Sequence, residues 1–238
     1  GRASDFFLGD PEDPESYREK AEEVDRRFDR DDRRRAAEVI SVPAAGDAGK
    51  LERLVEEGGY FVTTGQQPGL FSGPIYSIYK ALSAVGRARA LEQLLDRPVV
   101  PLFWIASEDH DWDEVGQTVV ADVENILREI EIPSPVKGTE PPLHRITLGH
   151  EVEEARSRLE GYLPQTDFSP PYRELIRRAY ASGSTLPSAF QTTLEELLGP
   201  FGLCFVQAHH PGLKKASLPV LFRELERSGE HESLLQER

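Results

Sequence analysis

The chain has 238 residues, with 28 lysines and arginines against 42 aspartates and glutamates and a formal net charge of −14 at pH 7. This length can bury a sizeable core, and the acidic balance disfavours nonspecific binding to nucleic acid. Cys204 is the only cysteine, which excludes an internal disulfide and favours a reducing cytoplasm. Because no apolar run approaches the roughly twenty residues that a membrane span needs, we expect no membrane partner.

The first 58 residues predict a charged helical segment that packs on a core. Residues 10–42 include the run RRFDRDDRRR, and we expect two helices there, broken near Arg30 and Asp31. Neighbouring acids neutralise much of the basic charge, which favours a solvated helix face over a nucleic-acid patch. Residues 47–57 predict another short helix. We expect a separate core over residues 59–217.

Residues 60–95 predict a strand, a loop and a helix. Residues 60–64 are β-branched and aromatic, which is typical of a buried strand. The helix is expected over residues 75–95, and its apolar stripe at helical spacing comprises Ile78, Leu82, Val85 and Leu91. A helix N-terminus at the carboxyl end of a strand is where open α/β sheets hold anionic ligands.

The loop between this strand and helix has the composition of a polar binding site. Its glycines recur every four residues, and glycine lets the main chain come close to a ligand. Two adjacent glutamines add amides that both donate and accept hydrogen bonds. The spacing matches neither the dinucleotide fingerprint nor the phosphate loop, so a tight turn without a ligand is the alternative. The residues expected to bind substrate here are Gly65, Gln66, Gln67, Gly69, Gly73, Pro74, Tyr76 and Lys80.

A second expected strand ends in a dense acidic cluster. Residues 99–106, VVPLFWIA, form an almost continuous apolar run, typical of a strand buried on both faces of a parallel sheet. Five acids and His110 then follow within residues 108–114. Helix capping accounts for one or two of these acids, but crowded carboxylates raise one another's pKa and need a cationic partner.

Three chemistries suit the acidic cluster. His110 beside Asp109 and Asp111 suits acid–base catalysis. Asp109, His110 and Asp113 could bind a divalent metal, although no second cluster of His or Cys supports a metal and we expect none. The acids could also hold the ammonium group of a substrate. If the two strands are parallel neighbours, Gln66 and His110 should border one cavity.

The remaining residues predict further strands and helices in alternation, which implies a largely parallel sheet with flanking helices. A proline-rich link, residues 133–142, is expected as a turn or hairpin loop between the strands on either side of it. The expected strands are residues 118–121, 127–132, 143–148 and 203–207, and the expected helices are residues 151–163, 169–181 and 186–198. Cys204 lies in one of these apolar strands, which favours a packing role over a nucleophilic one.

Two segments, TGQQPGLFSGPIYSIYKAL and PLFWIASEDHDWDEV, together resemble the bacillithiol biosynthesis cysteine-adding enzyme, also called bacillithiol synthase. Members of that family carry a very similar GQQ-x-GLF-[TS]-GP-x-Y-[TS] loop and a FWIA-x-EDHD-x-[DE]-E segment. The later piece FGLCFVQAHHPGLKKASLPVLFREL is also similar. Many members have acidic residues where this chain has Ala208, His209 and His210, so the roles of the two histidines stay open.

The resemblance implies a Rossmann-like α/β core similar to that of class I nucleotidyltransferases. It implies a ligase that joins L-cysteine to glucosaminyl-malate through an amide bond, with ATP or another nucleotide as the candidate activator of the cysteine. Asp109, His110 and Asp111 would be catalytic, while Glu108 and Asp113 would join the loop residues in substrate binding. The candidates for a second, lysine-rich signature are Lys214 and Lys215, for which an exposed helix start is the alternative.

The chain begins with Gly1, contains no methionine and ends in a charged helical pattern, so we expect a fragment that is inactive alone. The resemblance places the root of a coiled coil in residues 218–238. Its implied partners are L-cysteine and glucosaminyl-malate, with a homodimer as one candidate assembly of the full-length protein. The competing functions are a metal-dependent phosphoesterase, another nucleotidyltransferase-like enzyme, and a non-catalytic ligand-binding domain.

Overall fold

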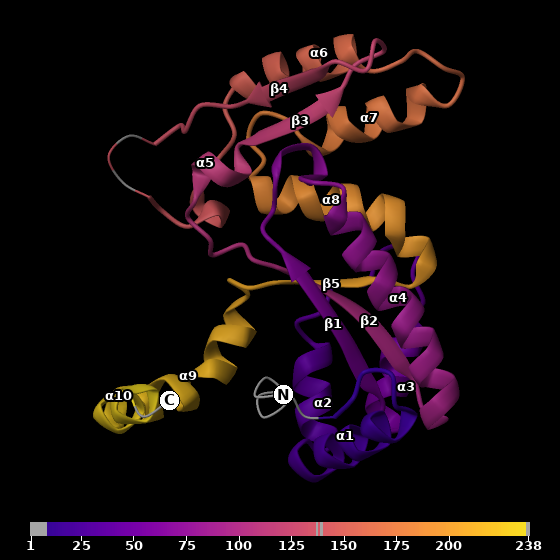
Figure 1. Ribbon diagram of the computed structural model, residues 1–238, viewed down its shortest axis with the longest axis vertical. Coiled ribbons are helices and arrows are strands. Elements are labelled where there is room, and N and C mark those ends of the chain that lie inside the picture. Colours follow the sequence, from indigo (N-terminus) through magenta and orange to yellow (C-terminus); the bar gives the residue numbers. More distant parts are fainter. Residues whose placement is uncertain (1–8, 137, 139, 237–238) are drawn as a thin grey trace.

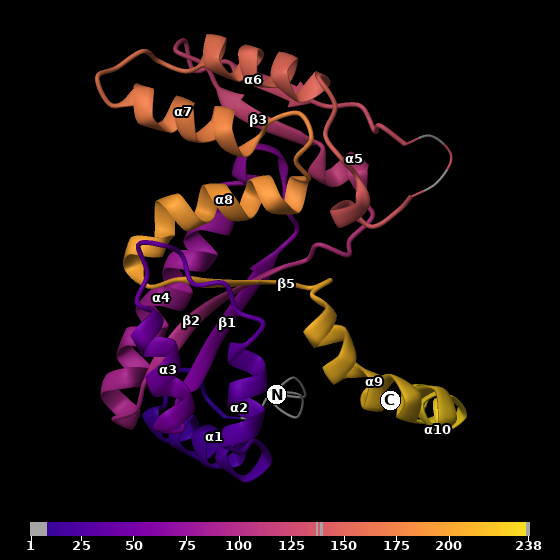
Figure 2. The same ribbon diagram turned by 180° about the vertical axis from the view of Figure 1, so that it is seen from behind.

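The computed structural model describes residues 9–136, 138 and 140–236. A parallel sheet lies in the lower half of the molecule in Figure 1, between two sets of helices, and a smaller module of one hairpin and several helices covers its upper end. The last helices project sideways from the sheet, as the view from behind in Figure 2 also shows.

The sheet consists of three parallel strands in the order β1, β2, β5. These strands are β1 (Tyr60–Gln66), β2 (Val99–Ile105) and β5 (Cys204–Gln207). The central strand β2 is buried except at Trp104, as its continuous apolar sequence predicts. The parallel Rossmann-like sheet with flanking helices is therefore confirmed.

Helices α4 (Tyr76–Leu95) and α8 (Leu186–Leu198) cover one face of the sheet. The centre of this layer is aromatic: the ring of Phe103 on β2 lies 5.9 Å from that of Phe190 on α8 and 6.2 Å from that of Phe205 on β5. All three rings are fully buried. Burial of such large apolar side chains is the main term that stabilises the layer.

The buried stripe of α4 differs from the expected one. Val85 is buried and Ile78 packs against the same cluster, but Leu82 is 39% exposed. The other buried residues of the helix are Ser77, Ala81, Ala84 and Ala88. Their small side chains let the helix axis approach the strands closely. The face of α4 that contacts the sheet is therefore formed by these small residues, and Leu82 lies outside it.

Helix α3 (Ala48–Glu56) and the segment of residues 39–42 cover the other face of the sheet. Leu54 of α3 is fully buried against this face. Ser41 pairs with Phe205 in an isolated antiparallel bridge at the edge of β5. Cys204 is a buried member of the same cluster, and burial raises the pKa of its thiol to about 11, which agrees with the expected packing role.

The N-terminal helices are α1 (Pro14–Arg27) and α2 (Arg30–Ala37), with the break two residues earlier than expected. Their charged surface is not wholly solvated, because Arg33 is buried. Its guanidinium donates to the carbonyls of Gly59 (3.0 Å) and Phe28 (2.5 Å) and to the Asp25 carboxylate (2.7 Å). Arg33 thus fastens both helices to the residue that precedes β1.

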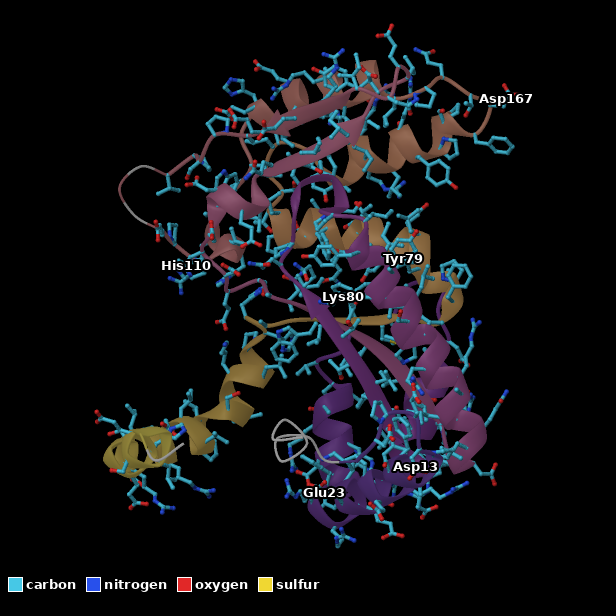
Figure 3. The ribbon with its side chains drawn as sticks, viewed as in Figure 1. Asp13, Glu23, Tyr79, Lys80, His110 and Asp167 are labelled. Carbon is cyan, nitrogen blue, oxygen red and sulfur yellow. The ribbon has the colours of Figure 1, made fainter. Side chains whose placement is uncertain are left out.

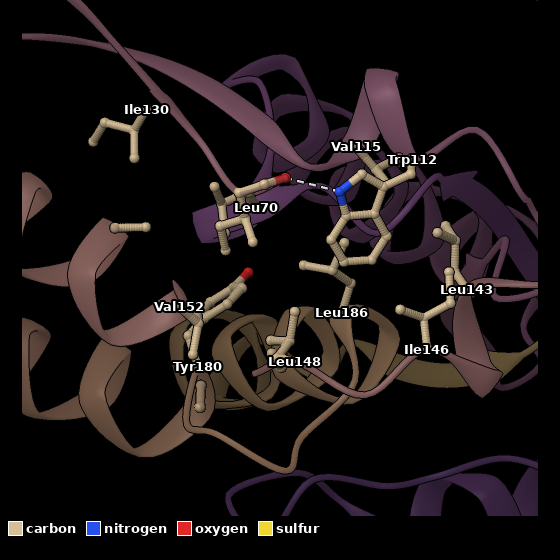
Figure 4. Packing of buried hydrophobic residues seen from close by; sticks show 14 of the residues in the cluster. Leu70, Trp112, Val115, Ile130, Leu143, Ile146, Leu148, Val152, Tyr180 and Leu186 are labelled. Atoms are coloured by element: carbon tan, nitrogen blue, oxygen red, sulfur yellow. Dashed lines mark hydrogen bonds between the residues drawn. The ribbon is translucent and has the colours of Figure 1, made fainter. Parts of the chain in front are cut away.

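The upper module is built around a hairpin of β3 (Gln117–Ala121) and β4 (Leu127–Glu131), which pair antiparallel. Helices α5 (Trp112–Val115), α6 (Glu151–Tyr162) and α7 (Ser169–Ala179) pack with it around a second apolar core (Figure 4). Within this core the Trp112 indole donates to the carbonyl of Ile132 at 2.8 Å, the dashed line in Figure 4.

The prediction of a strand over residues 143–148 is wrong. Leu143–Arg145 form the 3₁₀ helix η3, and Thr147 makes only an isolated bridge to Thr185. The partner of β4 is instead β3, through a turn in which Asn125 has a φ of 61°, a conformation that asparagine tolerates. The proline-rich link therefore leads away from the hairpin and does not close it.

The C-terminal part forms two helices, α9 (Pro211–Glu226) and α10 (Ser228–Gln236), joined at Arg227. The expected boundary at residue 217 lies inside α9, so the proposed division into three parts stays a prediction, as does the coiled coil. Within the described residues, no helix is both long and apolar enough to cross a membrane.

We predict that Arg33→Ala destabilises the chain far more than Arg35→Ala. The first change removes the partner of two backbone carbonyls near the sheet and costs about 2–4 kcal/mol. The second affects an exposed ion pair with Asp32 and costs about 0.5 kcal/mol or less. Urea unfolding followed by circular dichroism measures both, and equal midpoints for the two variants would contradict the anchoring role.

Candidate functional site at the carboxyl edge of the sheet

The carboxyl ends of the three strands lie side by side. In the register of the sheet Gln66 is opposite Ile105, which in turn is opposite Gln207. Two further hydrogen bonds extend the ladder past the strands, from Ala106 N–H to the Gln66 carbonyl and from Ala208 N–H to the Ile105 carbonyl, both at 3.0 Å. The adjacency of the glutamine loop and the acidic segment is therefore as the sequence predicts.

Two of the loop glycines are required by the chain's own packing. A Cβ on Gly65 would lie 2.6 Å from the carbonyl oxygen of Trp104, and one on Gly69 would lie 2.7 Å from the Cα of Gly73. These distances are too short for any side chain. The sequence suggested that these glycines let a ligand approach the main chain. In the structure they instead let two backbone segments of the chain approach each other.

The loop after β1 holds an uncommon backbone conformation. In and after the 3₁₀ helix η2 (Leu70–Ser72), the φ angles are 51° at Phe71, 78° at Ser72 and 64° at Gly73. Two consecutive non-glycine residues in the left-handed region are strained, and such strain persists only where the surroundings enforce it.

Tyr180, the residue after α7, supplies that enforcement. It is fully buried, and its hydroxyl accepts from Ser72 N–H (2.8 Å) and donates to the Gly69 carbonyl (3.2 Å). Its ring meets that of Phe71 edge-on at 5.0 Å. Burial raises the pKa of the Tyr180 phenol, which keeps the hydroxyl protonated and able to donate.

A continuous series of hydrogen bonds connects the loop to the segment after β2. The Lys80 ammonium donates to the carbonyl of Gly65 (2.5 Å) and to Oε1 of Gln66 (3.1 Å), so the lysine does reach back to the loop. Nε2 of Gln66 donates to Oε1 of Gln67 (3.2 Å) and to the Tyr76 hydroxyl (2.8 Å). Nε2 of Gln67 donates to the carboxylate of Glu114 at 2.8 Å. We call this series the amide relay.

The amide relay borders a cavity of about 320 Å³, which we call the glutamine cavity. Its volume is at the lower end of the range for small-molecule sites. It is lined by Gln66, Gln67, Gly69, Gly73, Pro74, Tyr76, Glu114, Val115, Gln117, Thr118 and Val119. Six of the expected substrate-binding residues line it, whereas Gly65 and Lys80 lie behind the wall. Glu114 and the β3 residues were missed, although Glu114 belongs to the acidic cluster of the sequence.

Asp111 and Asp113 of the cluster face a different cavity, of about 700 Å³, which we call the acidic cavity. It is lined by His110, Asp111, Trp112, Asp113, Ser134, Val136, Gly138, Glu140, Pro141 and Ile146. Figure 3 shows His110 at the outer side of the module, away from Lys80 on α4. The expectation that Gln66 and His110 border one cavity is therefore wrong. The loop after β1 and the acidic segment after β2 meet instead through Gln67 and Glu114, which together line the glutamine cavity.

Local capping explains why His110 and Asp111 turn away. The Asp109 carboxylate accepts from the backbone N–H groups of His110 (2.6 Å) and Asp111 (3.0 Å), and Asp111 caps α5 through Glu114 N–H at 3.0 Å. These bonds fix a tight turn that sends the next side chains outward.

Asp109 does not show the raised pKa that a crowded acidic cluster predicts. Burial raises the pKa of its carboxyl, but the Asp111 N–H, the Gln67 amide and the His110 N–H together outweigh burial and hold the pKa below the ordinary value. Asp109 is therefore an ionised residue that organises the turn. The catalytic roles expected of Asp109, His110 and Asp111 stay predictions.

Two histidines and a buried serine join the ends of β2 and β5. Ser107 is fully buried; its hydroxyl lies 2.8 Å from Nδ1 of His209 and accepts from His209 N–H at 3.1 Å. The ring of His144 stacks on that of His209 at 4.2 Å, and its Nδ1 lies 3.0 Å from the Ser107 carbonyl, which can only accept. Burial, followed by the neighbouring His144, lowers the pKa of His209 and favours its neutral form.

Glu108 forms an ion pair with Lys214 in the first turn of α9. Glu108 is not among the described residues that line either cavity, and its expected role in substrate binding stays a prediction. This exposed ion pair is what connects Lys214 to the carboxyl edge of the sheet. In the part of the chain that the structure describes, no three His, Cys, Asp or Glu side chains are grouped so that they could hold a metal ion.

The fold and this edge define a Rossmann-like domain with polar cavities at the carboxyl ends of its parallel strands, the edge at which open α/β sheets bind their ligands. Residues 2–238 match the family described as "Bacillithiol biosynthesis BshC, N-terminal Rossmann-like domain". The chain belongs to this family.

Similar curated proteins agree with this assignment. A protein of Solibacter usitatus named "Putative cysteine ligase BshC" is 34% identical over 239 residues, which cover 100% of this chain and 44% of that protein. Proteins with the same name from Heliobacterium modesticaldum and Carboxydothermus hydrogenoformans are 34% and 36% identical over 76% and 68% of this chain. The chain thus spans less than half the length of the curated relatives it matches.

We predict that Tyr180→Phe lowers stability by about 1–3 kcal/mol, because the Ser72 N–H and the Gly69 carbonyl lose their partner inside the protein. The matched control is Tyr172→Phe, since Tyr172 is 57% exposed, and a change of about 0.5 kcal/mol or less is expected there. Chemical denaturation measures both variants. If Tyr180→Phe is as stable as the unaltered chain, the phenol does not enforce the strained loop.

Proposed function

We propose that the chain is the substrate-binding N-terminal domain of a ligase that joins L-cysteine to glucosaminyl-malate through an amide bond. The observation that carries the proposal is the amide relay, which binds the loop after β1 to the segment after β2 and forms one wall of the glutamine cavity. Membership of the family and the names of the relatives support it.

The lining of the glutamine cavity suits a small polar ligand. Tyr76, Gln117 and Thr118 bring hydroxyl and amide groups, and Glu114 brings a carboxylate. Such groups match a molecule that carries hydroxyls and an amine. We assign the cavity to glucosaminyl-malate.

The acidic cavity is a second place for a reactant, because α5 supplies residues to both cavities. Asp111 and Asp113 favour a cationic group there by simple Coulomb attraction. His110, which lines this cavity and is exposed, is the candidate for proton transfer. Joining a carboxylate to an amine needs such a transfer, since the amine attacks only in its neutral form.

A nucleotide fits neither cavity well. The described residues that line them include three aspartates and glutamates in the acidic cavity and Glu114 in the glutamine cavity, but no lysine or arginine. Phosphate groups need cations or unpaired backbone N–H groups. We therefore assign no step to ATP within this domain, and the use of a nucleotide stays a prediction.

The other candidate functions receive less support. A metal-dependent phosphoesterase needs clustered ligands, and the described acids and histidines form no such group. A domain that binds ligand without catalysis is the expected behaviour of this chain alone, because it spans 44% of its Solibacter relative.

The test of the proposal is Gln67→Met in a longer protein that carries this chain as its N-terminal part. Loss of the amide breaks the relay and unpairs Glu114, so we expect ligation of L-cysteine to glucosaminyl-malate to fall about tenfold or more. Product is measured by mass spectrometry. Gln165→Met, at an exposed position outside both cavities, is the control. Undiminished ligation by the Gln67 variant would remove the glutamine cavity from the reaction.

A further inference from the structure

The direction of every hydrogen bond in the amide relay is fixed by its two ends. The Lys80 ammonium can only donate, so the atom of Gln66 that it contacts at 3.1 Å must be the carbonyl oxygen. The Glu114 carboxylate can only accept, so the atom of Gln67 at 2.8 Å must be the amide nitrogen. A flipped amide at either position would place two donors or two acceptors together, and the relay would break.

This fixed direction engages both N–H groups of Gln66 and commits the amide nitrogen of Gln67 to Glu114. The two N–H groups of Gln66 point to Gln67 and to Tyr76, and the amide nitrogen of Gln67 donates to Glu114. The hydroxyl of Tyr76 accepts from Gln66, which leaves its own hydrogen free to donate. One oxygen of the Glu114 carboxylate is engaged by Gln67, and the other is free to accept.

The amide relay therefore offers the ligand one donor, the Tyr76 hydroxyl, and one charged acceptor, the Glu114 carboxylate, while Gln117 and Thr118 bring further amide and hydroxyl groups to the same cavity. Glu114 is the only charged side chain among the described residues of its lining. A ligand group with a positive charge is attracted here, and a carboxylate is repelled. The group beside it must present an oxygen to Tyr76, and a neutral hydroxyl fits better than a second anion.

We propose that the glutamine cavity binds the amino-sugar end of its ligand, with the protonated amine on Glu114 and a neighbouring hydroxyl oxygen on Tyr76, and that Lys80 is a positioning residue that sets this polarity through Gln66. The inference rests on the proposed function, which it deepens by assigning one end of one substrate to these side chains. It distinguishes the two amines of the reaction: that of L-cysteine lies next to a carboxylate, whereas that of glucosamine lies next to hydroxyls.

The test is isothermal titration calorimetry of the 238-residue chain with glucosaminyl-malate and with glucosyl-malate, in which a hydroxyl replaces the amine. The chain should bind the amine about tenfold or more tightly. Glu114→Gln keeps the shape and the bond from Gln67 but removes the charge, so the two affinities should become equal within about threefold.

Lys80 is tested by the ratio of the two affinities, which a loss of stability alone would not change. Lys80→Met frees the Gln66 amide to rotate, and the preference for the amine should shrink at least about threefold. Lys80→Arg keeps a donor and should retain the preference. Arg89→Met, which alters an exposed cation on the same helix, serves as the control and should leave the ratio unchanged.

Three results would overturn the inference. If the chain binds both ligands equally, or if Glu114→Gln keeps the preference, the amine is not on Glu114, although the domain still binds glucosaminyl-malate as proposed. If L-cysteine displaces glucosaminyl-malate and Glu114→Gln weakens only cysteine, the cavity belongs to the other substrate of the same ligase. If no ligand binds, the proposed function of the domain fails together with the inference.

Discussion

The hydrogen-bond polarity imposed by Lys80 is the constraint on which the site depends. The lysine side chain crosses from α4 to the end of β1 and fixes the first of two adjacent amides, and the second amide then has to face Glu114. Because one end of this series is a cation and the other an anion, the series has one satisfactory arrangement. Because these side chains are already ordered in the free protein, binding of a ligand costs little further side-chain entropy.

Packing elsewhere in the molecule supports this arrangement. Gly65 brings the backbones of β1 and β2 together, and Tyr180 ties the upper module to the strained loop between β1 and α4. On the other side, Ser107 and the stacked histidines join the turn after β2 to that after β5. The sheet and the upper module thus meet at the edge that carries both cavities.

Much of the fold follows from local sequence pattern. The apolar run of residues 99–105 predicts the buried central strand, and the capping residue Thr185 accompanies a helix whose limits, Leu186–Leu198, are those expected. Long-range geometry is different. The burial of Arg33 and the exposure of Leu82 depend on which surfaces meet, and spacing along the chain does not contain that information.

The same limit applies to the site. Parallel neighbours bring the ends of β1 and β2 together, which is predictable from the βαβ order. Where each acid points is decided by turns only a few residues long: Asp109 and Asp111 accept backbone N–H groups as caps, His110 faces outward, and Glu114 accepts from Gln67. Composition identifies the acidic segment, but only the folded turn separates its members between two cavities.

The most direct measurement is a crystal structure of the chain with glucosaminyl-malate bound. We expect the ligand in the glutamine cavity, with its amine within about 3 Å of the Glu114 carboxylate and the amide relay unchanged. A ligand held instead in the acidic cavity beside His110, with the glutamine cavity filled only by solvent, would contradict the assignment of substrate to the wall that Lys80 organises.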